Sequence, residues 1–246
     1  MAEEPSTTPR SSLKDVVGAP FPVYAQAMED LAKDSFGVGL VVADADKLKK
    51  DRNPEDVEAY RRELQGQIEQ KINNQLEKSG SSPSDLTSAK AAGQVYAEEL
   101  SRRSAENDGS LDAHGNKVET GAGFSPEGAI PQALKAKGVD VQVVGLSSGL
   151  TPHLQSPDEK TSPNQCDFLS YKEEREAELG RAHAGYHEFG HAMMNSKHNG
   201  APSSFIPGPW SKDGNLQESG ADAFATAMLI RDHGEEGLAY GKKIAA

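Results

Sequence analysis

Three residues in the segment AGYHEFGHAMMNSKHNG (184–200) have the types and the spacing of a metal site. His187 and His191 are four residues apart, and Glu188 directly follows the first histidine. On an α-helix, which turns by about 100° per residue, two residues four apart lie about 40° from each other on one face. Both imidazoles can therefore bind one zinc ion, and the Glu188 carboxylate can reach a water molecule on that ion.

The same segment has the pattern of a helix with one buried face. It contains no proline, and an Asn-Gly pair follows at its end. Apolar or small residues recur at steps of three and four: Tyr186, Phe189, Gly190, Met193 and Met194. This spacing predicts that one face packs in the core while the two imidazoles lie on another.

A catalytic zinc ion needs a third protein ligand, and the downstream segment NLQESGADAFATAMLIRDHG offers two carboxylates. Glu218 and Asp222 are one helical turn apart and so share a face of the helix that this segment predicts. The segment also has an apolar stripe for the core: Ala221, Phe224, Ala225, Met228 and Leu229. One carboxylate can bind the ion while the other accepts a hydrogen bond from a ligating imidazole.

HEFGH followed by Glu-Ser-Gly-Ala-Asp resembles the gluzincin family of zinc metallopeptidases, whose pattern is HExxH and then ExxxD, commonly ExxAD. The resemblance covers Tyr186 to about Ile230, under a quarter of the chain. It implies that zinc is held by His187, His191 and Glu218.

The resemblance also gives Glu188 the role of general base, and it assigns Asp222 the hydrogen bond to a ligating histidine. It implies a strand before the metal-binding helix whose edge binds an extended peptide, and VDVQVVG (139–145) is in the right place. The related metzincin pattern does not fit, because it needs glycine at Met194 and histidine at Lys197.

Zinc peptidases of this kind usually add a donor for the oxyanion that develops at the scissile carbonyl. Three residues qualify, and the sequence does not choose among them: Tyr186, His233 and Tyr240. His183, one turn before His187, is expected to support a ligand or to be exposed. Cys166 is expected to be an ordinary small residue.

Composition excludes several classes of protein. The formal net charge of −12 argues against nucleic acid and against an anionic membrane as partners. Residues 1–20 lack the basic and apolar regions of a secretory signal peptide, and no apolar run reaches the ~20 residues of a membrane span. These features predict a soluble protein made in the cytosol, which acts there or leaves by a leader-independent route.

The N-terminal half predicts a disordered tail (1–18), a Val-rich strand (36–46) and two helices. Asn53 and a following proline begin the first helix, Gly80 ends it, and the second covers about 82–106. The first helix carries one apolar stripe: Val57, Tyr60, Leu64, Ile68, Ile72 and Leu76. We therefore expect a helical hairpin whose stripe packs on the rest of the chain or on a partner.

A polar loop (106–123) marks the predicted start of a catalytic region that covers 107–246. A short helix, the strand VDVQVVG with one buried face, and a long helical stretch from Asp167 follow in this region. The predicted fold class is α+β: a minimal zincin-like domain in which a small sheet packs on the HExxH helix. An N-terminal extension (19–106) precedes it.

The sequence thus predicts a zinc-dependent endopeptidase with one Zn²⁺ per chain. Its substrate would be a protein or peptide segment that pairs with the strand near Val139 to Val144, and its N-terminal helices would recruit a protein partner. A bacterial effector and a regulatory protease both fit.

Two alternatives remain. The first is a helical protein-interaction module with a structural or degenerate zinc site. The second is a non-peptidase zinc amidohydrolase, which would have a closed pocket. Glu188 argues against the first, because a structural site usually closes with four protein ligands and needs no adjacent carboxylate.

Overall fold

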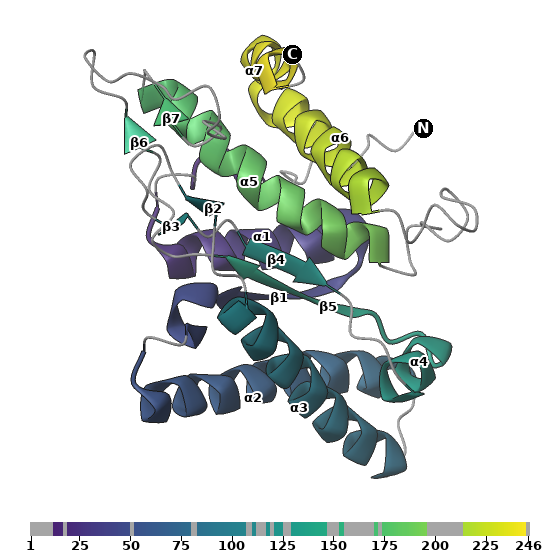
Figure 1. The fold of residues 1–246 in the computed structure, drawn as a ribbon. Coiled ribbons are helices and arrows are strands. Elements are labelled where there is room, and N and C mark those ends of the chain that lie inside the picture. The colour runs from purple at the N-terminus through teal and green to yellow at the C-terminus, as the bar shows by residue number, and fades with distance from the viewer. Residues whose placement is uncertain are drawn as a thin grey trace, which may run out of the picture.

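A computed structural model gives the fold of the chain (Figure 1). It describes residues 12–16, 19–49, 52–79, 83–106, 110–111, 117–118, 121–124, 129–146, 153–154, 170–171, 174–195 and 214–244. Most of the predicted tail, most of the predicted loop at 106–123, and Cys166 lie outside these residues.

A mixed sheet of three strands lies at the centre of the molecule. The strands are ordered β1-β5-β4: β1 (Gly39–Asp44), β5 (Val141–Leu146) and β4 (Gly121–Phe124). β1 runs parallel to β5, with Gly39 opposite Val141, and β4 runs antiparallel to β5. The central strand is therefore β5, and β1 and β4 form the two edges.

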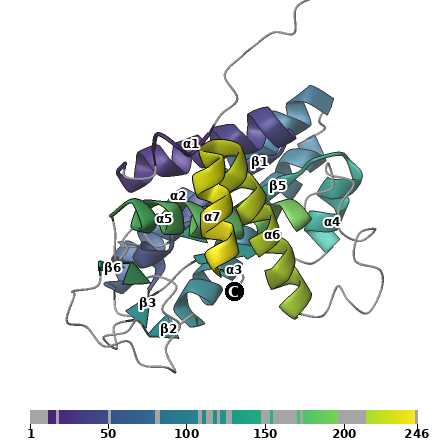
Figure 2. The same cartoon turned by 90° about the horizontal axis from the view of Figure 1, so that it is seen from above.

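Helices cover both faces of this sheet (Figure 1). On one face lie α1 (Phe21–Phe36) and α5 (Glu174–Asn195). On the other face lie α2 (Pro54–Ser79), α3 (Pro83–Glu106) and the short α4 (Ala129–Ala136). Seen from above, α6 (Gly214–His233) and α7 (Glu235–Ile244) lie over α5 (Figure 2). The helices and the small sheet confirm the predicted α+β class.

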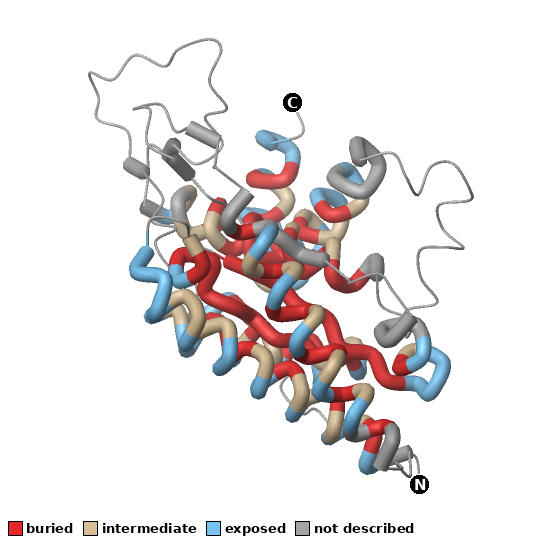
Figure 3. The backbone as a smooth tube through the Cα atoms, turned by 60° about the horizontal axis from the view of Figure 1, so that its bottom comes forward, coloured by how far each residue is buried: buried red, intermediate tan, exposed pale blue. Residues whose placement is uncertain are grey.

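Alternate residues of the two long strands point into two separate cores. Leu40 on β1 and Val144 on β5 pack with α1, α5 and α6, whereas Val41 and Val143 pack with α2 and α3. All six residues of β5 are buried, as the continuous red strand in Figure 3 shows. The prediction of one buried face for this strand is therefore wrong, because helices cover both of its faces.

The predicted helical hairpin is confirmed as α2 and α3. Asn53 begins α2 as expected, since its side-chain oxygen accepts a hydrogen bond of 2.9 Å from the backbone N–H of Glu55. The last four residues of the predicted stripe are almost fully buried: Leu64, Ile68, Ile72 and Leu76. This stripe packs on the sheet of the same chain and on α3, so a partner would have to bind the polar faces of the hairpin.

The predicted boundary at residue 107 does not coincide with a break in the packing. β1 lies before that boundary and pairs along its whole length with β5, which lies after it. Helix α1, which the sequence did not predict, buries Tyr24, Met28 and Leu31 in the same core as α5. The fold also includes part of the predicted tail, because Leu13 is fully buried in that core.

The remaining described elements are short. They are η1 (Ala45–Leu48), the antiparallel pair β2 (Ser110–Leu111) and β3 (Lys117–Val118), and the parallel pair β6 (His153–Leu154) and β7 (Ser170–Tyr171). The helix predicted from Asp167 begins at Glu174, after β7. None of the helices in the described ranges combines the length and hydrophobicity that crossing a bilayer requires.

Candidate metal centre

Helix α5 holds the HExxH residues, and its position is fixed by what it buries. Ala182, Tyr186, Phe189 and Ala192 are fully buried against α1, α6 and the sheet. Met193 is also buried, which leaves Met194 as the one residue of the predicted apolar face whose side chain lies outside the described set. The face predicted from the spacing is therefore the one that packs in the core.

The two motif histidines meet through the nitrogens that a metal ion would use. His187 Nε2 and His191 Nε2 lie 3.1 Å apart, and the ring planes are inclined at 82°. Two nitrogens at 2.0–2.1 Å from a tetrahedral zinc ion would lie about 3.3–3.4 Å apart. The pair is thus within a few tenths of an ångström of the spacing that a shared zinc ion requires.

Asp222 fixes which nitrogen of His187 carries the proton. Its Oδ1 lies 2.7 Å from His187 Nδ1. A carboxylate accepts a hydrogen bond there, so Nδ1 carries the proton and Nε2 is left as the metal-binding nitrogen. The chain of contacts thus runs from the Asp222 carboxylate on α6 to the His187 ring and then to the His191 ring on α5.

Glu218 belongs to α6 and precedes Asp222 by one helical turn. Its side chain lies outside the described set, so its role as third ligand stays a prediction. Within the described side chains, which do not include Glu218, no group of three potential metal ligands is found. The two imidazoles nevertheless match the donors that zinc prefers, and Asp222 binds the nitrogen of His187 that would not face the ion.

Glu188 is 6% exposed, whereas His187 and His191 are half-buried. Glu188 is therefore buried within the fold, while solvent can still reach the two imidazoles. This burial distinguishes Glu188 from a surface glutamate on a solvated helix face, and its role as a base stays a prediction.

A close approach of α5 and α6 brings Asp222 to His187. A β-carbon added at Gly190 would lie 3.0 Å from Ala221 Cα and 3.2 Å from its carbonyl oxygen. Just beside this contact, the ring of Phe189 meets the ring of Phe224 edge-on at 5.6 Å. The glycine inside HEFGH therefore lets the two backbones approach each other.

Of the three candidate oxyanion donors, two lie away from the histidine pair. The Tyr186 hydroxyl donates to Asp232 and accepts from the backbone N–H of Leu13 at 3.2 Å. Burial and Asp232 raise its pKa, so the phenol stays protonated in this contact. Tyr186 thus connects the N-terminal segment to α6, and its hydroxyl is already engaged.

His233 is the last residue of α6, eleven residues after Asp222, which corresponds to roughly 16 Å along the helix axis. Its Nδ1 lies 3.2 Å from the guanidinium of Arg175, near the start of α5. His233 therefore lies at the opposite end of the helix pair from the motif. Tyr240 on α7 is closer, since its ring lies 6.0 Å from that of His183.

His183 is buried, which the sequence left open. It is 7% exposed, its ring lies 6.3 Å from that of His187, and its Nε2 has no hydrogen-bond partner among the described atoms. Burial lowers the pKa of this imidazole to about 4, with smaller effects of Asp222 and His187. The feature of the sequence that singles out this residue is its spacing, because His183, His187 and His191 follow one another at steps of four.

Comparison with protein-family models, curated proteins and solved structures finds no match to this chain. The interpretation of the site therefore depends on its residues and their geometry.

Purified protein should bind about one zinc ion per chain. We expect substitution of His187, His191 or Glu218 by alanine to remove it, as measured by metal analysis after dialysis. Asp222→Asn should keep the site but weaken zinc binding by roughly 10–100-fold. His233→Ala is the control and should leave the zinc content unchanged; an equal loss in this variant, or no loss in the others, would contradict the assignment.

Gly190→Ala tests the helix contact. The added methyl group must push α6 away, so we expect a loss of about 1–3 kcal/mol in the free energy of unfolding by urea. Gly66→Ala on α2 is the control, because a β-carbon there meets nothing within 4 Å. It should stabilise the chain by roughly 0.5–1 kcal/mol. Stabilisation by both substitutions would show that the contact is loose.

Proposed function

We propose that the chain is a zinc-dependent endopeptidase of the gluzincin type with a zincin-like fold. The observation that carries this proposal is the line from Asp222 through His187 to His191, with the two Nε2 atoms 3.1 Å apart. In a chance HExxH sequence on a surface helix, nothing would hold a carboxylate from another helix against the outer nitrogen of the first histidine.

His187, His191 and Glu218 would hold the ion. When bound, zinc supplies a Lewis acid that polarises a carbonyl group and acidifies water. Asp222 keeps the proton of His187 on Nδ1 and so keeps Nε2 as the ligand. Glu188 would accept a proton from the attacking water and pass it to the leaving amine, a transfer that typically contributes 10²–10⁴-fold to the rate.

The substrate would bind at a strand other than the one expected. β5 pairs with β1 on one side and β4 on the other, so residues 139–144 offer no unpaired edge to a peptide. β4 forms the edge of the sheet on the side of α5, and it contacts that helix. An extended protein segment that pairs with β4 would lie beside the metal-binding helix.

The alternative of a purely structural metal site is less well supported. Such a site usually closes with four protein ligands, whereas here a buried glutamate directly follows the first histidine. Hydrolysis uses that carboxylate, and structural metal binding does not.

Glu188→Gln should keep about one zinc ion per chain and lose hydrolysis of an unstructured protein by at least roughly 100-fold, because an amide cannot accept the proton. Peptide products are measured by mass spectrometry, and zinc by metal analysis. Glu178→Gln is the matched control and should retain full activity, because Glu178 is a half-exposed residue of the same helix that pairs with Arg175. Full activity of Glu188→Gln with normal zinc content would rule out the proposed base.

A further inference from the structure

The edge of the sheet opposite β4 lies in a groove between α1 and α2. The groove has a volume of about 1270 Å³. It is lined along one side by α1 and along the other by a polar stripe of α2, with β1 between them (Figure 1). This groove lies on the far side of β5 from β4.

Two outward backbone N–H groups of β1 are bound by side chains. The N–H of Gly39 faces β5, since it donates to the Asp140 carbonyl at 3.0 Å, so the N–H groups of Val42 and Asp44 point outward. Val42 N donates to Glu29 Oε1 at 3.2 Å, and Asp44 N donates to the Tyr60 hydroxyl at 2.7 Å. These two oxygens take the places of the carbonyl oxygens that a neighbouring strand would supply.

Each of these positions also has a lysine beside it. Lys71 Nζ lies 2.6 Å from Glu29 Oε2, so one carboxylate accepts from a backbone amide and from an ammonium group together. Lys47 Nζ lies 4.7 Å from the centre of the Tyr60 ring. Along β1, two amide donors that are bound by side chains therefore lie beside lysines, and one of these lysines, Lys71, is paired with Glu29.

Four acidic residues line the groove together with five lysines. Asp44 is buried, and its carboxylate accepts a hydrogen bond from Asp46 N. Glu29 is held by Val42 N and Lys71. The other acidic residues of the groove, Glu63 and Glu77, belong to the α2 wall. Lys137, which follows α4, is paired with Asp85. The lysines of the lining come from α1, η1, α2 and the turn after α4: Lys33, Lys47, Lys71, Lys78 and Lys137.

We propose that the edge of β1 binds an acidic segment of another protein in extended conformation. The backbone of this segment would pair with β1, and its carboxylates would take the place of Glu29 next to Lys71 and lie beside Lys47. Backbone pairing accounts for affinity in such complexes, and the flanking charges account for the choice of partner. The site is independent of the proposed metal centre.

Glu29 and Tyr60 also shield the edge of β1 from pairing with other chains. Proteins commonly protect exposed sheet edges in this way. Shielding alone predicts no binding of peptides. If the edge binds peptides, a negatively charged strand should displace Glu29 and Tyr60 from the backbone N–H groups of β1. The two explanations therefore differ in a direct measurement.

The first experiment uses the full chain and three labelled octapeptides in low salt: alternating Val-Glu, Val-Gln and Val-Lys. Fluorescence anisotropy should show that the Val-Glu peptide binds most tightly and that the Val-Lys peptide does not bind. Methylation of alternate backbone nitrogens of the Val-Glu peptide should abolish binding in one register and spare it in the other. No binding, equal binding of the three peptides, or an equal effect of both methylation patterns would overturn the proposal.

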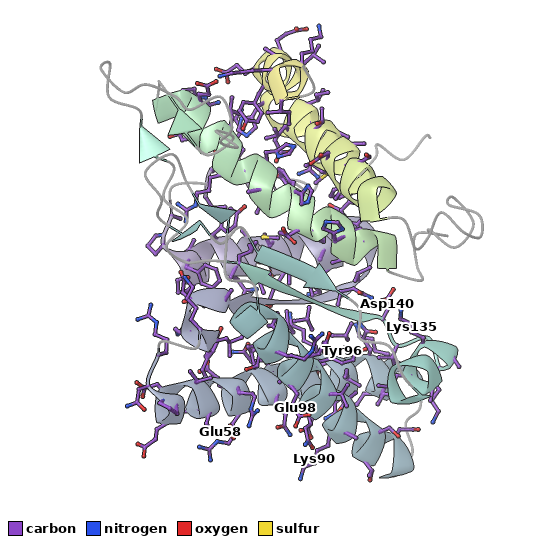
Figure 4. The ribbon with its side chains drawn as sticks, viewed as in Figure 1. Glu58, Lys90, Tyr96, Glu98, Lys135 and Asp140 are labelled. Carbon is purple, nitrogen blue, oxygen red and sulfur yellow. The ribbon has the colours of Figure 1, made fainter. Side chains whose placement is uncertain are left out.

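Variants then locate the site. Lys71→Met should weaken binding of the Val-Glu peptide by roughly two- to fivefold, and Glu29→Gln should tighten it by a similar factor, because its carbonyl oxygen still accepts from Val42 N while the competing charge is gone. Lys90→Met is the control; this residue lies on α3, is exposed and is outside the groove (Figure 4). Thermal unfolding checks that each variant is folded. Equal effects of Lys71→Met and Lys90→Met would contradict the assignment.

Discussion

The close contact between α5 and α6 is the constraint on which the candidate site depends. Metal-binding residues of this kind come from two helices, so the helices must approach closely enough for a short aspartate side chain to reach a histidine. Gly190 permits this approach because it places no β-carbon against Ala221. Asp222, the residue after Ala221, then lies 2.7 Å from His187. A bulkier residue at position 190 would separate the two parts of the site.

Other contacts hold α5 against the rest of the molecule. On the side of α1, a β-carbon at Gly185 would overlap the Tyr24 hydroxyl, so glycine again lets two helices meet. The ring of Phe36 at the end of α1 packs edge-on against Phe189 at 5.5 Å. Near the end of α6, the Tyr186 hydroxyl joins Asp232 to the backbone of Leu13. The HExxH helix is thus held by the N-terminal segment, by α1 and by α6.

Local patterns in the sequence predicted much of this structure. The steps of three and four in α2, the cap at Asn53 and the apolar face of α5 depend on residues close in the chain, and these predictions agree with the helices and the buried faces. The spacing of Glu218 and Asp222 likewise predicted a shared helix, and both residues belong to α6.

Features that depend on residues far apart in the chain could not be predicted in this way. The alternation in VDVQVVG suggested one exposed face, but Gln142 is buried and donates to Asp140 at 2.6 Å, because helices cover both faces of the sheet. The pairing of β1 with β5 joins segments about a hundred residues apart, and no local pattern shows it. The separation of His233 from the motif follows from the antiparallel packing of α5 and α6, which spacing alone does not fix.

X-ray absorption at the zinc edge of the metal-loaded chain tests the central claim most directly. We predict a first shell of two imidazole nitrogens with oxygen donors, at about 2.0–2.2 Å, and an open position for water. His187→Ala should give no such spectrum, because this variant should not retain the ion. A shell without imidazole, or one closed by four protein ligands, would contradict the account.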